Sequence, residues 1–365
     1  MARGWMALAL WLGAVVQGAA QGAAQAPGQQ GFAGLGQAAE EYAPVRRETV
    51  MAFPEDHDAH PAFRIEWWYV TATLETDDGT PHGVQWTLFR FATRPDDEAD
   101  GWASGQLWMG HAAATGRDVH HAAERFGRGG VGQAGVTLEP AFAAWIDEWS
   151  LESLAGPEAD PFDTMRLRAG DGAFAFDLTL DAQGPLVLHG EGGFSVKSDR
   201  GHASHYYSQP NFAARGTLRI GETEVAVTGN AWLDREWSSQ PLDPDQVGWD
   251  WFSLSLSDDT RLMLYRLRMA DGRDARAFGT WIDAEGRATP LSGDDITMEP
   301  LGTVSVAGRP TPVRWRIAVP QKGIAVETEP LNPQAWNALT VPYWEGPVTV
   351  RGSHDGRGYL EMTGY

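Results

Sequence analysis

Most of the chain alternates apolar and polar residues in short runs, the pattern of half-buried β-strands. Turn signals that contain glycine, such as residues 77–79 and 271–272, separate these runs. Helical periodicity is scarce, and only residues 117–126 and 333–339 suit short helices. The pattern predicts an all-β protein with few short helices, built from sandwiches or barrels. The predicted strands cover residues 65–74, 84–91, 173–180, 225–232, 252–256, 261–268, 303–306, 313–317 and 348–351.

A repeat within the chain indicates that one β unit occurs twice. Residues 66–70 (Glu-Trp-Trp-Tyr-Val) are echoed by residues 250–254 (Asp-Trp-Phe-Ser-Leu), and an Asp-rich turn follows each copy. The next predicted strand ends in Arg90 in the first copy and in Arg266 in the second. Because order, spacing and residue type agree, we expect two tandem antiparallel β-barrel domains, over residues 45–214 and 215–365.

Period-two alternation places one acid of each copy on an apolar strand face. Glu66 shares its face with Trp68, and Asp250 shares its face with Phe252. An inward carboxylate costs several kcal/mol unless it is paired or protonated. We therefore expect the structural pairs Glu66–Arg90 and Asp250–Arg266, and the alternative is a proton donor with a raised pKa at the mouth of a pocket.

The first residues differ from the rest of the chain. A short positive start is followed by an apolar run over residues 5–16, which is too short to span a bilayer, and then by small residues. This pattern is typical of a secretory signal peptide over residues 1–20, cleaved near residue 21 or 25. Residues 21–44 begin Gly/Ala/Gln-rich and are expected to form a flexible linker. The expected location is therefore periplasmic or secreted, as a soluble protein.

Composition excludes several classes of function. The formal net charge of −21 argues against nucleic-acid binding, which needs a basic face. The chain has no cysteine, so a disulfide, a Cys-ligated zinc and a thiol nucleophile are excluded. Its histidines lack the spacing of a metal site, and Gly-rich phosphate loops and Gly-x-Ser-x-Gly motifs are absent. We expect no metal and no cofactor.

Four segments together resemble a known family. They are the Glu-Trp-Trp-Tyr strand at residues 66–69 with residues 85–90, residues 190–195 leading to 205–208, residues 229–237, and residues 358–365. This set is similar to the AttH-like family of predicted secreted hydrolases, within the superfamily of carotenoid 1,2-hydratases (hydroxyneurosporene synthases). The resemblance implies two lipocalin-like β-barrel domains. The resemblance implies a superfamily whose members hydrate carotenoids or hydrate and cyclise natural products, and many of whose members are exported proteins of no proven activity. Some of these exported members accompany membrane transporter components.

The segment at residues 232–237 combines two tryptophans with two acids and is the candidate site. Hydration of an isoprenoid alkene needs a carboxylic acid to protonate the double bond and aromatic faces to stabilise the cation. We expect an apolar cleft between the two barrels, where Asp234 donates the proton, Trp237 faces the cation and Tyr265 holds the water. The expected ligand-binding neighbours are Trp232, Arg235 and Glu236.

Arg235 stands where the resemblance implies a histidine. An arginine cannot shuttle protons near neutral pH. It could instead pair with Asp234 and lower the pKa of that carboxyl, and the cleft would then bind without reacting.

Three functions remain open from the sequence. The first is an exported carrier of an apolar small molecule, isoprenoid or lipid-like, that hands its ligand to a membrane transporter. The second is a hydratase-type enzyme acting on an isoprenoid double bond. The third is a non-catalytic protein-interaction module. A carboxylic acid beside a pocket would favour the enzyme, and filled barrels without a cavity would favour the interaction module.

Overall fold

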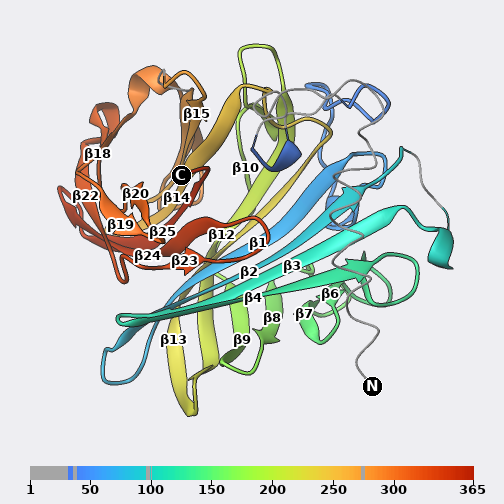
Figure 1. Ribbon diagram of the computed structural model, residues 1–365, viewed down its shortest axis with the longest axis horizontal. Coiled ribbons are helices and arrows are strands. Elements are labelled where there is room, and N and C mark those ends of the chain that lie inside the picture. The colour runs from blue at the N-terminus through green and yellow to red at the C-terminus, as the bar shows by residue number, and fades with distance from the viewer. Residues whose placement is uncertain (1–31, 36–38, 96–98, 100, 273–275) are drawn as a thin grey trace.

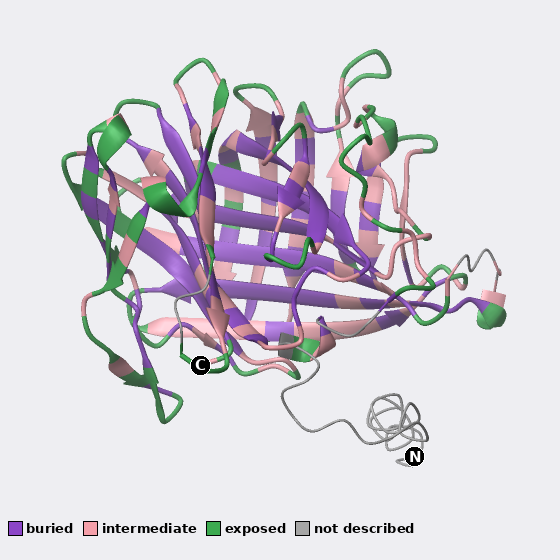
Figure 2. Cartoon of the chain, turned by 90° about the horizontal axis from the view of Figure 1, so that it is seen from above, coloured by how far each residue is buried: buried purple, intermediate pink, exposed green. Residues whose placement is uncertain are grey.

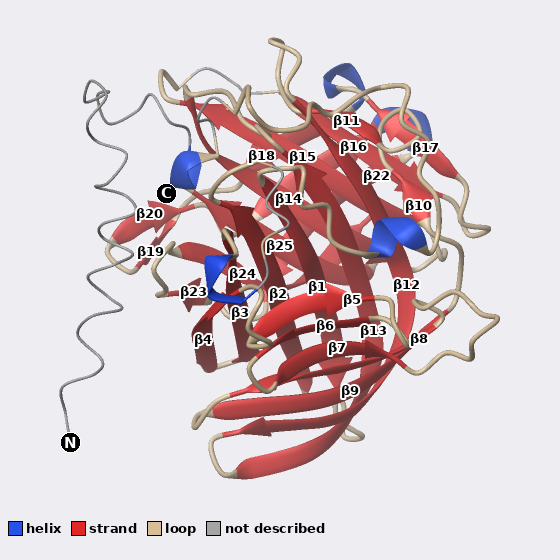
Figure 3. Ribbon diagram, turned by 90° about the vertical axis from the view of Figure 1, so that its right-hand side faces the viewer, coloured by secondary structure: helices blue, strands red, loops and turns tan. Residues whose placement is uncertain are grey.

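The computed structural model describes residues 32–35, 39–95, 99, 101–272 and 276–365, which are almost entirely β-structure (Figure 3). The expected signal peptide at residues 1–20 lies outside the described residues, and so does the linker up to residue 31. A described part of the linker contacts the first domain, because Arg64 donates hydrogen bonds to the carbonyls of Gly34 (3.3 Å) and Leu35 (3.2 Å). None of the helices described here is long and apolar enough to cross a membrane. The short 3-10 helices are η1 (Phe32–Gly34), η2 (Glu55–His57), η3 (Gly101–Ala103), η4 (Gly293–Asp295) and η5 (Pro320–Lys322).

The first sheet has thirteen strands and curls into a nearly closed barrel. Its order is β4-β3-β2-β1-β13-β12-β9-β8-β7-β6-β5, and β10 and β11 pair with β12. The strands are β1 (Ile65–Glu75), β2 (Pro81–Ala92), β3 (Gln106–Gly116), β4 (Val119–Arg128), β5 (Ala134–Thr137), β6 (Ala143–Ile146), β7 (Trp149–Ser153), β8 (Thr164–Gly170), β9 (Phe174–Ala182), β10 (Val187–Leu188), β11 (Phe194–Val196), β12 (Ala203–Ile220) and β13 (Thr223–Ser238).

The barrel of the first sheet curls until strands far apart in its order touch. A Cβ atom on Gly110 of β3 would lie only 2.7 Å from the side chain of Ile146 on β6. Glycine is therefore required at this position, where the two ends of the sheet approach each other. The barrel encloses a continuous apolar core that includes Trp68, Trp86 and Trp149.

The second sheet has ten strands and forms a curled half-barrel, seen end-on at the left of Figure 1. Its order is β17-β16-β15-β14-β25-β24-β22-β21-β18, with β23 paired to β24, and a separate hairpin joins β19 to β20. It encloses its own core around Phe252, Trp315 and Trp344. The strands are β14 (Gln246–Leu256), β15 (Arg261–Met269), β16 (Ala277–Ile282), β17 (Ala288–Leu291), β18 (Thr297–Pro300), β19 (Val304–Val306), β20 (Arg309–Thr311), β21 (Trp315–Val319), β22 (Ile324–Pro330), β23 (Trp336–Asn337), β24 (Tyr343–Gly352) and β25 (Gly356–Thr363).

The two sheets repeat one arrangement of strands, as the repeat in the sequence predicts. The order β3-β2-β1-β13-β12-β9 of the first sheet matches β16-β15-β14-β25-β24-β22 of the second. Glu66 lies opposite Arg90 on the neighbouring strand, and Asp250 lies opposite Arg266 in the same way. The fold is therefore two lipocalin-like β domains in tandem.

The boundary expected after residue 214 falls inside β12 and needs correction. Strands β12 and β13 form one long hairpin, and β13 continues to Ser238 while it pairs with β1. The first sheet therefore ends at Ser238 and the second begins at Gln246. The end of the first domain is set by the pairing of β13 with β1, which lies about 170 residues earlier in the chain. Local sequence does not show which distant strand will pair with β13.

The two segments that the sequence predicted as short helices form strands and turns instead. Residues 119–126 lie in β4, whose backbone pairs with β3 along its length. Residues 333–339 contain a turn and β23, which pairs with β24. Segments this short are marginal as helices in water, and pairing with a neighbouring strand satisfies their backbone instead.

The outer faces of the two sheets pack against each other, with β1 beside β25 and β2 beside β24 (Figure 1). We call the side chains between them the inter-domain layer. Their burial makes the middle of the molecule purple in Figure 2. The layer is rich in tyrosine, tryptophan and carboxyl groups, and its members are Tyr69, Lys197, Tyr206, Trp232, Asp234, Glu236, Trp251, Tyr265, Tyr343, Glu345, Tyr359 and Glu361.

Candidate functional site

The candidate segment of β13 is divided between two faces of the sheet. Trp232 packs in the inter-domain layer, whereas Trp237 belongs to the core of the first barrel. Trp237 stacks on His60, with ring centroids 4.0 Å apart. The prediction of one cleft lined by Trp232, Trp237 and Tyr265 is therefore wrong. Side chains alternate along a strand, so Trp237 lies on the face of β13 opposite to Asp234.

Arg235 also points into the first barrel, and its partner is Glu66 rather than Asp234. Glu66 is fully buried and binds both Arg235 and Arg90. Burial alone would raise the pKa of Glu66, but the two guanidinium groups hold it well below its usual range. Arg235 is therefore not the partner of Asp234, and the expected ion pair between these two residues is wrong.

Asp250 occupies the corresponding place in the second sheet but is held differently. Its nearest arginine is Arg268, at 2.6 Å, whereas Arg266 is 3.7 Å away. The hydroxyl of Tyr365 donates a further hydrogen bond of 2.8 Å. Burial raises the pKa of Asp250 despite these partners. Glu66 and Asp250 are thus both paired with arginines inside the two barrels, away from the inter-domain layer.

Asp234 is the acid of the candidate site, with a carboxyl group that is only 3% exposed. Tyr206 donates a hydrogen bond of 2.5 Å to one carboxyl oxygen. Trp232 (2.5 Å) and Ser208 donate to the other. Burial raises the pKa of Asp234 to about 7, although the three donors oppose the shift. A substantial fraction of Asp234 is therefore protonated near neutral pH and can act as an acid.

Glu236 lies on the same face of β13 and has a cation partner. The ammonium of Lys197 is 2.9 Å from its carboxylate, and Ser204 donates a hydrogen bond to it. The chain contains only two lysines, and this one is 1% exposed. Lys197 also lies over the rings of three aromatic residues, each within about 5 Å: Tyr206, Tyr265 and Phe278.

Tyr265, expected from the sequence to join Asp234, does lie in the same layer. Its ring stacks on Phe278, with centroids 5.1 Å apart. Burial raises the pKa of Tyr265 well above its usual value, and the nearby Glu236, Glu361 and Asp234 add to the shift. The structure therefore brings together Trp232, Asp234, Glu236 and Tyr265 of the predicted site, and separates Arg235 and Trp237 from them.

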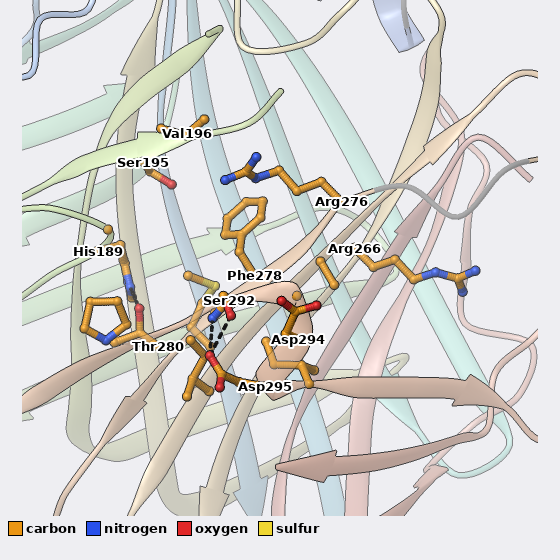
Figure 4. A pocket seen from close by; sticks show the side chains of 18 of the residues that line it. His189, Ser195, Val196, Arg266, Arg276, Phe278, Thr280, Ser292, Asp294 and Asp295 are labelled. Atoms are coloured by element: carbon orange, nitrogen blue, oxygen red, sulfur yellow. Dashed lines mark hydrogen bonds between the residues drawn. The ribbon is translucent and has the colours of Figure 1, made fainter. Parts of the chain in front are cut away.

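A pocket of about 870 Å³ opens beside this layer, between residues 189–196 and the wall of the second sheet. Apolar side chains such as Met263 and Phe278 line part of it, and charged side chains line another part, including Arg266, Arg276 and the acidic side chains of η4. Figure 4 shows His189 and Thr280 side by side at one end. Phe278 thus has the pocket on one side and Tyr265 of the inter-domain layer on the other.

A chain of hydrogen bonds joins the pocket to Asp234. His189 contacts the hydroxyl of Thr280 at 2.8 Å through Nδ1 and that of Ser208 at 2.6 Å through Nε2. Ser208 in turn donates to Asp234. Burial, followed by the charge of Lys197, lowers the pKa of His189 to about 3, so its ring is neutral. A single residue, Ser208, therefore stands between the carboxyl of Asp234 and His189, which lines the pocket.

Several residues of the layer were not singled out from the sequence. Tyr206 and Ser208 fall in the segment at residues 205–208, and Glu361 falls in the segment at residues 358–365, both of which carry the family resemblance. His189 and Glu345 have no comparable local signal. Among the described residues, no group of His, Asp and Glu side chains could hold a metal ion.

The fold is a pair of tandem lipocalin-like β domains with a group of buried acids between them. The AttH-like family model matches residues 44–365, so the chain belongs to the AttH-like family. A crystal structure assigned as AttH from Nitrosomonas europaea is 33% identical, with a TM-score of 0.76, and covers 88% of this chain and 99% of its own. No curated protein sequence matches.

Two further solved structures share the fold. Kievitone hydratase from Nectria haematococca is 15% identical, with a TM-score of 0.64, over 88% of this chain and 96% of its own. CghA, solved with Sch210972, is 14% identical, with a TM-score of 0.53, over 90% and 97%. At this identity the likeness concerns the fold alone.

Proposed function

We propose that the protein is an acid catalyst of the hydratase type, which adds water to a carbon–carbon double bond of an apolar, isoprenoid-like substrate. The observation that carries this proposal is Asp234, a buried carboxyl whose pKa is raised to about 7 within an aromatic layer. An acid that is still protonated near neutral pH can donate to an alkene, whereas an ordinary aspartate is ionised. One of the structural neighbours is itself named a hydratase.

The pocket suits an apolar substrate and ends close to the acid. We propose that the hydrocarbon lies along Met263 and Phe278, with the reacting double bond at the end where His189 and Thr280 lie. The ring of Phe278 would face the cation that forms on protonation, and Tyr265 would support that ring from behind. A pocket of this size is within the range of small-molecule sites, which are mostly apolar with a few polar groups.

The reaction balances with Asp234 as the source and the final acceptor of the proton. The carboxyl O–H bond breaks as its proton passes to Ser208, Ser208 passes its own proton to Nε2 of His189, and a proton on Nδ1 of His189 forms the C–H bond. This leaves a carbocation and the carboxylate of Asp234. Water attacks the cation, and the proton that it loses returns to the carboxylate. The product is the tertiary alcohol, and Asp234 is protonated again for the next turnover.

A carrier for the same class of ligand is the second candidate, and the size and apolar lining of the pocket support it. If the protein is a carrier, the pocket binds its ligand and the double bond is not hydrated. Export to the periplasm or the exterior, and delivery to a membrane transporter, stay proposals based on the first residues and on the family. The interaction module has the least support, because a cavity is present beside the filled barrel cores.

The test is incubation of the purified protein with acyclic isoprenoid alkenes in H₂¹⁸O, followed by mass spectrometry of protein-bound and free products. The enzyme proposal expects an ¹⁸O-labelled alcohol from the wild type, and from Asp234→Asn the same bound alkene without alcohol. Asp77→Asn, which changes an exposed turn far from the layer, is the matched control and should behave as the wild type. Bound alkene without alcohol in all three proteins would favour the carrier, and no bound alkene in any would contradict both.

A further inference from the structure

A second group of acids lies in the inter-domain layer, on the side away from the pocket. Glu345 of β24 and Glu361 of β25 are directly opposite each other in the sheet. Tyr69, from the first domain, donates a hydrogen bond of 2.5 Å to Glu345. Asn337 donates a second one of 3.2 Å. Glu345 is 1% exposed and none of the arginines or lysines described here pairs with it, so its charge is poorly compensated.

Hydrogen bonds connect Glu345 to the surface through the first domain. Tyr343 lies two residues before Glu345 on the same face of β24, within reach of its carboxyl, and its hydroxyl lies 3.0 Å from Nδ1 of His111. Nε2 of His111 lies 3.1 Å from a carboxylate oxygen of Glu124. The side chain of Glu124 is 14% exposed, whereas that of His111 is 2% exposed. The four side chains thus form one row from solvent to the buried carboxyl.

The layer as a whole contains more acids than cations. Asp234, Glu236, Glu345 and Glu361 share it with a single described cation, Lys197. Like charges in a low-dielectric space cannot all be ionised, so part of this group must hold protons. Protons held so deep need a route, because water does not reach Glu345 directly.

We propose that Glu124, His111 and Tyr343 form a proton path that loads and unloads Glu345 at the inter-domain layer. In one state a proton taken up by Glu124 faces Nε2 of a neutral His111, whose Nδ1–H donates to Tyr343, and Tyr343 donates to the carboxylate of Glu345. The O–H bond of Glu124 breaks as Nε2 gains the proton, Nδ1 passes its own proton to the phenol oxygen, and the phenol passes its proton to Glu345. The result is an ionised Glu124, a neutral His111 with its proton on Nε2, and a protonated Glu345. The same transfers in reverse unload Glu345, so one proton moves along the path and no other reactant is consumed.

The groups that face Glu345 support its role as the inner end of this path. Glu361 faces it from β25 and Tyr69 from β1, and Asn337, hydrogen-bonded to His120 (2.8 Å), faces it from β23. Burial raises the pKa of Glu345 well above its usual value, and the charge of Glu361 raises it further. Burial also raises the pKa of Glu361 to about 7, and the charges of Asp234 and Glu236 contribute to this shift. A proton held at Glu361 is therefore felt at Asp234, although among the described residues no hydrogen bond joins the two groups of acids.

The use of this path in turnover rests on the proposed function, but the path itself can be tested without a substrate. The measurement is the rate at which the carboxylic-acid band of Glu345 shifts in the infrared spectrum after transfer to D₂O. The band is assigned by its loss in Glu345→Gln. In the wild type we expect exchange through the path, faster than opening of the domains. In Tyr343→Phe and in His111→Phe we expect exchange slower by about tenfold or more, because it then requires local unfolding of the interface.

Tyr359→Phe is the matched control, since Tyr359 is a buried tyrosine of the same layer that lies outside the path. It should exchange as the wild type does. If Tyr343→Phe does not fold, Glu124→Gln tests the outer end and should also slow the exchange. Equal exchange rates in the wild type and the path variants would overturn the proposal, and so would the absence of a carboxylic-acid band for Glu345. Neither result depends on whether an alkene is hydrated, so failure of the path and failure of the proposed function are distinguishable.

Discussion

Asp234 and Arg235 are adjacent in β13, yet their side chains lie on opposite faces of the sheet. Arg235 binds Glu66 inside the first barrel, and Asp234 faces the second domain, where its donors are Tyr206, Trp232 and Ser208. This separation leaves Asp234 free of a guanidinium partner, so that burial can raise its pKa. The same strand thus supplies a structural ion pair to one side and a buried carboxyl with a raised pKa to the other.

Glu66 and Asp250 should differ in their contribution to stability, although they are equivalent in the repeat. Glu66→Gln leaves Arg90 and Arg235 buried without a negative partner, and should cost roughly 3–5 kcal/mol in the free energy of unfolding. Asp250→Asn should cost less, because Arg266 and Arg268 are 20% and 14% exposed and can reach water. Denaturant unfolding of both variants measures the difference. Equal costs would contradict this account of the two pairs.

Close approach of the two domains depends on a glycine of β2. A Cβ atom on Gly83 would lie 2.6 Å from Pro347 of β24, a contact across the interface. Gly83→Val should therefore separate the sheets locally, lower the melting temperature and increase hydrogen exchange of the strands beside it. Gly79→Val is the control for the loss of a glycine. Its φ of +81° strains a valine, but open space surrounds the position, so no contact between the domains is disturbed. The account fails if Gly83→Val leaves exchange at the interface unchanged.

The raised pKa of Asp234 predicts the sign of a pH effect on stability. Its pKa is about 7 when folded, against an ordinary value of 3.8, so the folded protein keeps a proton that the unfolded chain has released. This contribution to stability is present below about pH 4 and is lost as the pH rises through 7. Buried histidines such as His189, whose pKa is lowered, act in the opposite direction. The prediction therefore concerns the difference between Asp234→Asn and the wild type.

Relative to the wild type, Asp234→Asn should gain stability steadily between pH 4 and pH 7. Its amide cannot ionise and so escapes the cost of a buried charge. Urea titrations of both proteins at pH 4.5, 5.5, 6.5 and 7.5 measure this trend. A constant difference across that range would show that Asp234 titrates as an ordinary carboxyl.

The strand pattern and the repeat were readable from the sequence because both depend on short-range order. Alternation located β1 and β14 and placed Glu66 and Asp250 in equivalent positions. The same alternation, applied to residues 232–237, also separates Trp237 from Asp234. The domain boundary could not be found in this way, because β13 is assigned by its pairing with β1.

The rest of the candidate site depends on contacts between segments that are distant in the chain. Tyr69 meets Glu345 and His111 meets Tyr343 only because two outer sheet faces pack together. The pocket likewise lies between residues 189–196 and the second sheet. Local patterns show which faces are apolar, but they do not show which faces meet. Asp234 was identified by chemistry, and its partners required the structure.

The pH profile of alkene hydration tests the central claim most directly. With an alkene that the protein hydrates, the rate of the wild type should be level below pH 7 and fall about tenfold per pH unit above it, as Asp234 ionises. Asp234→Asn should be slower by about 10²–10⁴-fold at pH 6 and lose this dependence, with binding of the alkene retained. A variant that keeps the rate and profile of the wild type would show that the acid is elsewhere and would contradict the account.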